Sequence, residues 1–230
     1  MTVRYLVLWP TAACDLACSY CYRRDRRGAR MPIEVADAAL DLVEEGAQAT
    51  GRPAHVQLAG GEPTLVPSVV EHIARRVVAI RGATVTCGIQ TNGARLNGDM
   101  IAMLKRYGLR VGVSIDGPPA VQEATRGSAA QTFRGLFALA QADIPVRVTT
   151  VLSARNVDHL DELALTLAGF PNITGFGLDP LVAIGSAAGR DDLVPADQAV
   201  IDGITTLYRS LAQINACLLY TSDAADEEDS

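Results

Sequence analysis

Residues 55–92 read HVQLAGGEPTLVPSVVEHIARRVVAIRGATVTCGIQTN, and this stretch decides the fold because it holds a complete strand–helix–strand unit. Its apolar run at 55–59 predicts a strand that stops at a glycine pair. Pro67, near the first turn, opens a helix predicted over 67–80. Residues 83–90 are rich in β-branched side chains and predict the next strand. Two strands joined through a helix indicate a parallel pair.

The same alternation extends in both directions along the chain. The other predicted strands are 3–9, 109–115, 146–152 and 173–178, and the other predicted helices are 32–48, 98–107, 132–142, 157–168 and 195–214. The predicted strands are almost continuously apolar, which is expected when both faces of a sheet are covered. We therefore predict an α/β fold, a partial (β/α)6 barrel of the TIM type with parallel strands. A doubly wound sheet is the alternative, although no G-x-G-x-x-G follows the first strand.

Composition excludes several classes of function. The chain has 230 residues, 49% of them apolar, and a net charge of −6. Five acidic residues lie at positions 223, 226, 227, 228 and 229, so the rest of the chain carries about −1 and offers no basic field for nucleic acid. No apolar run approaches the roughly 18 residues of a membrane span. The first ten residues are too short and too weakly basic for a signal peptide, so we expect a cytoplasmic location.

A cysteine cluster follows the first predicted strand, with the spacing Cys14-x3-Cys18-x2-Cys21. In a cytosolic protein such a cluster indicates a metal site rather than disulfides. The spacing matches neither ferredoxin pattern, and a zinc site would lack a fourth ligand because no histidine is near. Three thiolates suit a [4Fe–4S] cube that keeps one iron open. Zinc completed from a distant ligand, or three ordinary cysteines, remain as alternatives.

Three more strand ends carry unusual polar or glycine-rich sequences: Gly60-Gly61-Glu62-Pro63, then 90–93 (Q-T-N-G), then 114–117 (S-I-D-G). Because function gathers at the carboxyl ends of parallel strands, these motifs and the cysteines should surround one opening. Asp179, after the sixth strand, faces the same opening either as a ligand contact or as a turn cap.

The residues from Cys14 to Cys21 resemble the C-x3-C-x-aromatic-C signature of the radical S-adenosylmethionine (radical SAM) superfamily, and Gly60–Pro63 resembles its GGEP motif. The resemblance covers about residues 3–195. It implies that Cys14, Cys18 and Cys21 ligate a [4Fe–4S] cluster whose open iron is chelated by the amino and carboxylate groups of S-adenosylmethionine (SAM). The cofactor would supply the difficult chemistry, and the barrel would position it and exclude water.

The resemblance also implies contacts around the methionyl part of SAM. Gly60 and Gly61 would let the backbone approach it, since glycine has no Cβ to obstruct a ligand. Glu62 would accept a hydrogen bond from the ammonium group, and Pro63 would fix the turn. Arg126, after the fourth strand, is the candidate partner for the carboxylate, because opposite charges would then flank the zwitterion. A surface charge is its alternative role.

The remaining residues implied by the resemblance lie on the same opening. Tyr20 would lie near the adenine, with a role in packing alone as its alternative. Asn92, Ser114 and Asp116 would contact the sugar and methionyl parts. Thr91 is a further candidate, with a turn-stabilising hydroxyl as its alternative role.

Residues 90–93 and 114–118 resemble the branch that modifies peptides and proteins, which includes the anaerobic sulfatase-maturating enzymes and peptide maturases. This implies reductive cleavage of SAM to a 5′-deoxyadenosyl radical and hydrogen abstraction from a peptide or protein residue. The expected partners are that substrate and an electron donor such as flavodoxin or ferredoxin. The arginines at 23, 24, 26, 27 and 30 form either a solvated loop or a patch for an acidic peptide or reductant. No catalytic residue is identified.

Two other functions stay open. One is a radical SAM enzyme acting on a small molecule, as in cofactor biosynthesis. The other is a non-catalytic iron–sulfur or zinc protein, which would not bind SAM and gives no reason for a glycine turn after the second strand.

The chain divides into three predicted parts. Residues 1–195 form the radical SAM core. Residues 196–216 form a last helix leading toward a missing C-terminal region, which in the resembled branch is a SPASM domain with auxiliary clusters. Residues 217–230 resemble the translation of a transposase adapter used in sequencing libraries, so we expect this tail to be non-native and Cys217 to ligate nothing.

Overall fold

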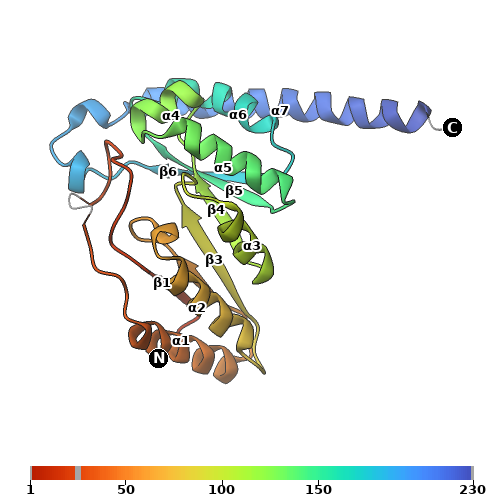
Figure 1. The fold of residues 1–230 in the computed structure, drawn as a ribbon. Coiled ribbons are helices and arrows are strands. Elements are labelled where there is room, and N and C mark those ends of the chain that lie inside the picture. Colours follow the sequence, from red (N-terminus) through yellow and green to blue (C-terminus); the bar gives the residue numbers. More distant parts are fainter. Residues whose placement is uncertain (1, 24–26, 229–230) are drawn as a thin grey trace.

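A computed structural model describes residues 2–23 and 27–228 of the chain. Six parallel strands form one sheet in the order β1-β2-β3-β4-β5-β6. They are β1 Tyr5–Leu8, β2 Ala54–Leu58, β3 Val85–Thr91, β4 Arg110–Ser114, β5 Val146–Leu152 and β6 Ile173–Pro180. Strand order follows chain order without the reversal of a doubly wound sheet, and β1 does not pair with β6. The partial (β/α)6 barrel predicted from the sequence is therefore confirmed (Figure 1).

Helices cover the outer face of the sheet. They are α1 Ile33–Thr50, α2 Pro67–Ala79, α3 Gly98–Arg106, α4 Pro119–Thr125, α5 Ala129–Gln141, α6 Leu160–Ala168 and α7 Asp197–Glu228, with short 3₁₀ turns η1 Pro63–Leu65, η2 Val157–His159, η3 Gly185–Ala187 and η4 Asp191–Leu193. Most match the predicted ranges closely. Helix α4 falls where the sequence predicted only a polar loop; its start at Pro119 suits the fixed φ of proline at a first helical position.

Side-chain alternation separates the two faces of the sheet. Val56, Ile89 and Val113 point outward into the helix layer and are fully buried. On these strands the intervening residues are small or polar, as at Gln57, Gly88 and Gly112, and face the inside of the barrel. The outer face therefore supplies the core, while the inner face is left free for polar functions.

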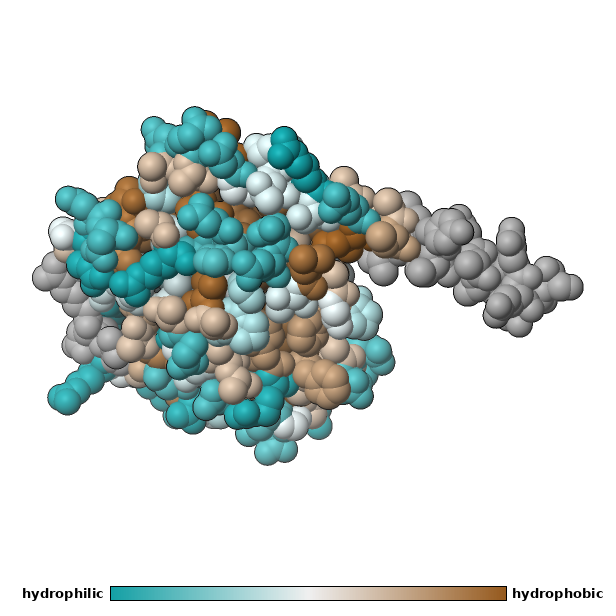
Figure 2. Space-filling view, turned by 90° about the horizontal axis from the view of Figure 1, so that it is seen from above, coloured by the Kyte–Doolittle hydropathy of each residue, from teal (hydrophilic) through white to brown (hydrophobic). Residues whose placement is uncertain are grey.

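Helix α7 begins close to its predicted start but continues past 214 to Glu228, and it projects from the body (Figure 1). An apolar groove of about 810 Å³ lies between α6, β6 and α7. Figure 2 shows apolar side chains gathered where α7 leaves the body. Among the described residues, no helix is long and apolar enough to cross a membrane.

Candidate functional site

A cavity of about 490 Å³ opens at the carboxyl ends of the strands, within the usual size range of ligand pockets. The four sequence motifs meet there. The predicted residues that line it are Cys14, Cys18, Tyr20, Cys21, Gly60, Gly61, Glu62, Thr91, Asn92, Ser114 and Arg126. Pro63 and Asp116 are the two predicted residues that do not line it. The expectation of one shared opening is confirmed.

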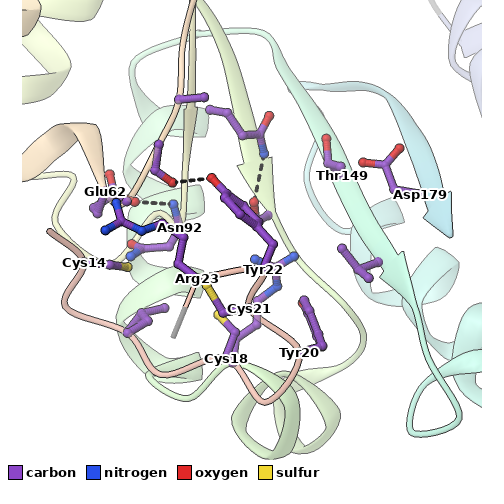
Figure 3. A pocket seen from close by; sticks show the side chains of 18 of the residues that line it. Cys14, Cys18, Tyr20, Cys21, Tyr22, Arg23, Glu62, Asn92, Thr149 and Asp179 are labelled. Atoms are coloured by element: carbon purple, nitrogen blue, oxygen red, sulfur yellow. Dashed lines mark hydrogen bonds between the residues drawn. The ribbon is translucent and has the colours of Figure 1, made fainter. Parts of the chain in front are cut away.

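The three cysteines project into this pocket from one loop after β1 (Figure 3). Their thiols are free, and burial raises the pKa of Cys14 to about 11 and also raises that of Cys18. In the described part of the chain, no three His, Cys, Asp or Glu side chains are grouped so that they would hold one metal ion. The sulfurs thus share a cavity without converging on a single point.

The glycine turn after β2 holds the cysteine loop in place. The Gly61 N–H donates to the Thr11 carbonyl at 3.1 Å, and the Glu62 N–H donates to the Ala13 carbonyl at 2.8 Å. A Cβ at Gly61 would lie 2.0 Å from the Ala13 carbonyl oxygen, and Gly60 has φ +112°. The sequence assigned both glycines to ligand approach. The structure shows in addition that the cysteine loop itself requires them.

Glu62 is a buried carboxylate surrounded by donors. Its Oε1 accepts from the Thr64 N–H at 3.0 Å, the Thr64 hydroxyl at 2.7 Å and the Thr91 hydroxyl at 2.7 Å. Among the described residues, its Oε2 accepts only from the Asn92 N–H, at 2.7 Å, and Glu62 lines the pocket. Oε2 therefore retains capacity for one more donor, such as the ammonium group predicted for it. Burial raises the pKa of Glu62 above its ordinary value despite these donors.

Glu62→Gln is expected to lower the free energy of unfolding by about 1–3 kcal/mol, because the new amide must turn a donor toward existing donors. The raised pKa means that the folded state holds the Glu62 proton more tightly than the unfolded state. That contribution is fully present below the unfolded pKa and is lost as pH rises through the folded pKa. The stability gap between wild type and variant should therefore widen as pH falls. Urea unfolding at several pH values measures it.

Glu45→Gln is the matched control, since Glu45 is exposed on α1. It should leave the free energy of unfolding nearly unchanged at each pH. A Glu62→Gln gap that stays constant or narrows on acidification would contradict the assignment.

Tyr20, Asp116 and Arg126 form a buried network beside the cysteines. Arg126 donates to Asp116 through Nε at 2.9 Å and Nη2 at 3.1 Å, and its guanidinium lies 5.4 Å from the centroid of the Tyr20 ring. The Tyr20 hydroxyl also donates to Asp116. Asp116 is fully buried, and burial raises the pKa of Tyr20 well above its usual range. Burial alone would lower the pKa of Arg126, but the Asp116 carboxylate raises it, so the guanidinium stays charged.

Asp116 does not line the pocket, and the SAM contact predicted for it remains a prediction. Its carboxylate lies behind Arg126 and away from the pocket lining, because Arg126, Tyr20 and the Val151 N–H occupy its oxygens. Arg126 lines the pocket, and its Nη1 takes part in neither bond to Asp116. Asp116 thus orients a pocket cation, and the contacts with SAM predicted for Arg126 and Tyr20 remain predictions.

The end of β3 is also tied to the cysteine loop. The Asn92 side chain donates to Asp15 at 2.9 Å, and Arg95 donates to the other Asp15 oxygen at 2.6 Å. Ser114 accepts from the Gln90 side chain at 2.9 Å. Gln90, which is not among the predicted site residues, therefore lines the pocket and orients Ser114.

One wall of the pocket was not predicted. It comes from the segment after β6, where Leu181, Val182 and Ile184 join Asp179 in the lining. The Ser186 N–H donates to the Cys21 carbonyl at 2.7 Å, and a Cβ at Gly185 would lie 2.2 Å from the Tyr22 carbonyl oxygen. A close chain crossing of this kind has no local sequence signal except the glycine.

Of the arginines in the basic stretch at 23–30, Arg24 and Arg26 lie outside the described residues.

The residues of the pocket fit a cube-shaped cluster with SAM beside it. Three free thiols line one cavity. A carboxylate with a spare acceptor site and a guanidinium with a spare donor line the same cavity, which suits the two charges of an amino acid.

Residues 10–167 match the Radical SAM superfamily. The chain belongs to this family and is a radical SAM enzyme, whose cofactors are a [4Fe–4S] cluster and S-adenosylmethionine.

Similar proteins differ in what they act on. An AdoMet-dependent heme synthase of Methanosarcina barkeri is 30% identical over 84% of this chain and 55% of its own length. The mycofactocin maturase MftC of Mycobacterium tuberculosis is 32% identical over 69% of this chain and 40% of its own length. The solved structure of anSMEcpe with bound AdoMet and a peptide is 18% identical with a TM-score of 0.69, covering 79% of this chain and 52% of the other. This chain thus spans about half the length of the relatives it matches.

Proposed function

We propose that this chain is the radical SAM core of a cytoplasmic peptide maturase, which abstracts a hydrogen atom from a residue of a peptide or protein. The observation that carries the proposal is the meeting of three thiols, Glu62 and Arg126 in one cavity whose far wall is apolar. When bound, the reduced cluster supplies one electron that cleaves SAM into methionine and the 5′-deoxyadenosyl radical.

The protein's own groups position the reactants. Glu62 binds the ammonium and Arg126 binds the carboxylate of the methionyl group, so the amino acid end is fixed by charge-assisted hydrogen bonds. Asp116 keeps Arg126 charged and oriented through two hydrogen bonds. The apolar side chains after β6 exclude water from the space where hydrogen transfer occurs.

A peptide substrate is supported by the resemblance of 114–118 to the peptide-modifying branch and by the likeness to a maturase. A second candidate is favoured by the similarity to a heme synthase over 84% of the chain, which would make the substrate a tetrapyrrole. We also propose that the intact protein continues into a SPASM-like region, and that a flavodoxin or ferredoxin delivers the electron.

Anaerobic reconstitution with iron, sulfide, dithionite and SAM tests the core activity. The wild-type chain should release 5′-deoxyadenosine, measured by mass spectrometry, whereas Cys18→Ala should release none because one iron loses its thiolate. Cys217→Ala is the matched control and should behave as wild type, since Cys217 is exposed on α7. Release that is equal in Cys18→Ala and wild type would overturn the assignment.

Substrate class is tested with deuterated candidates. Peptides encoded beside the gene of the intact parent should transfer deuterium to 5′-deoxyadenosine, and tetrapyrroles should not. Transfer from a tetrapyrrole alone would favour the second candidate.

A further inference from the structure

Two arginines lie on the inner face of the sheet, below the pocket. Strand alternation places Arg147 on the same face as Thr149 and Val151, which line the pocket. Arg110 likewise shares a face with Ser114, another lining residue. Both arginines are exposed. The inner face of this open barrel therefore presents two cations to a ligand that enters the barrel.

Arg147 lies between glycines on both sides. Strand register pairs it with Gly112 on β4 and with Gly175 on β6. A Cβ at Gly175 would lie 3.6 Å from its Nη1, and one at Gly177 would lie 3.7 Å from its Nη2. The guanidinium therefore lies beside Gly175 and Gly177, where β6 carries no side chain on its inner face. This leaves space next to the guanidinium inside the barrel.

A bulge in β6 creates this arrangement. Val146 pairs with Ile173 while Arg147 pairs with Gly175, so Thr174 is the extra residue on β6. A regular ladder would place Thr174 opposite Arg147 and bring its side chain to the inner face. β-Bulges near functional sites commonly redirect side chains in this way.

Neither arginine has an ion-pair partner among the described residues. No carboxylate of the described residues lies within 4.0 Å of either guanidinium. On the inner face of the described strands the acidic residue is Asp179, at the pocket end of β6 (Figure 3). Arginine prefers carboxylates because its planar fork donates two parallel hydrogen bonds to them.

We propose that Arg147, with Arg110 as a second cation, binds a carboxylate of the peptide substrate; the inference rests on the proposed function. Arg147 lies two residues below Thr149, which is about 7 Å along an extended strand. An extended peptide covers that distance in two residues. The acidic residue thus lies about two positions from the peptide residue that reaches Thr149 in the pocket lining.

Calorimetric titration of the reconstituted 230-residue chain tests this without SAM or reductant. The probes are a capped peptide, Gly-Ala-Glu-Ala-Ser-Gly, and its counterpart with Gln for Glu. Wild type should bind the acidic peptide about five- to tenfold more tightly, and added salt should weaken this preference. Arg147→Gln should remove most of the preference, and Arg147→Lys should restore part of it because charge returns without the fork.

Arg134→Gln is the matched control, since Arg134 is exposed on α5, on the outer face. It should retain the full acidic preference. Equal binding of the two peptides by wild type would overturn the proposal, and so would a preference that Arg147→Gln leaves unchanged. Release of 5′-deoxyadenosine is measured separately on the same wild-type protein, so its failure with a retained preference would count against the proposed activity alone.

Discussion

Gly61→Ala is expected to abolish assembly of the iron–sulfur cluster. The new methyl group would lie 2.0 Å from the Ala13 carbonyl oxygen, where no Cβ can remain. The obstacle is backbone, so the strain cannot be relieved by rotating a side chain. The cysteine loop must therefore move away from the turn, which breaks the Gly61 and Glu62 hydrogen bonds to Thr11 and Ala13.

Overpacking of this kind costs about 1–3 kcal/mol, and the lost hydrogen bonds add to it. Iron and sulfide analysis after reconstitution, together with the electron paramagnetic resonance spectrum of the reduced protein, measures the outcome. Gly98→Ala is the control, since a Cβ at Gly98 meets no atom within 4 Å. A Gly61→Ala protein with a full cluster and an unchanged melting temperature would show that the turn does not hold the loop.

Asp116→Asn should destabilise the protein by about 3–5 kcal/mol, the usual cost of leaving a buried charge without its partner. The exposed fraction is 10% for the Arg126 side chain and 0% for that of Asp116. An asparagine keeps the shape of the site but removes the charge that holds the guanidinium. Chemical denaturation measures the loss, and SAM binding should weaken because Arg126 loses its orientation.

A double variant tests whether the lost stability comes from the unpaired charge or from the changed shape of the site. Asp116→Asn combined with Arg126→Met leaves no buried charge, so it should recover part of the lost stability while SAM binding stays weak. Asp192→Asn is the control, because Asp192 pairs with Arg190 at an exposed position and should change stability little. An Asp116→Asn protein as stable as wild type would contradict the buried pair.

The local patterns predicted most elements well because the periodicity and the boundaries of each strand and helix depend on residues that are close together in the sequence. The glycine pair after 55–59 and Pro67 mark the boundaries of β2 and α2 without reference to the rest of the chain. Helix α4 was missed because it is a single short segment whose polar Gln122 is buried, accepting a hydrogen bond from the Asp116 N–H. That contact with Asp116, six positions earlier in the chain, leaves no trace in the periodicity of α4.

By itself the sequence determined the parallel α/β barrel, the three cysteines and the opening that they share with the other strand ends. Those features follow from alternation and from the rule that parallel strands end on one edge. Only the tertiary structure decided that Gly61 supports the cysteine loop, that Asp116 lies behind Arg126, and that the segment after β6 closes the pocket. Each of these depends on contacts between separate elements of the fold, whose distances and burial no local pattern encodes.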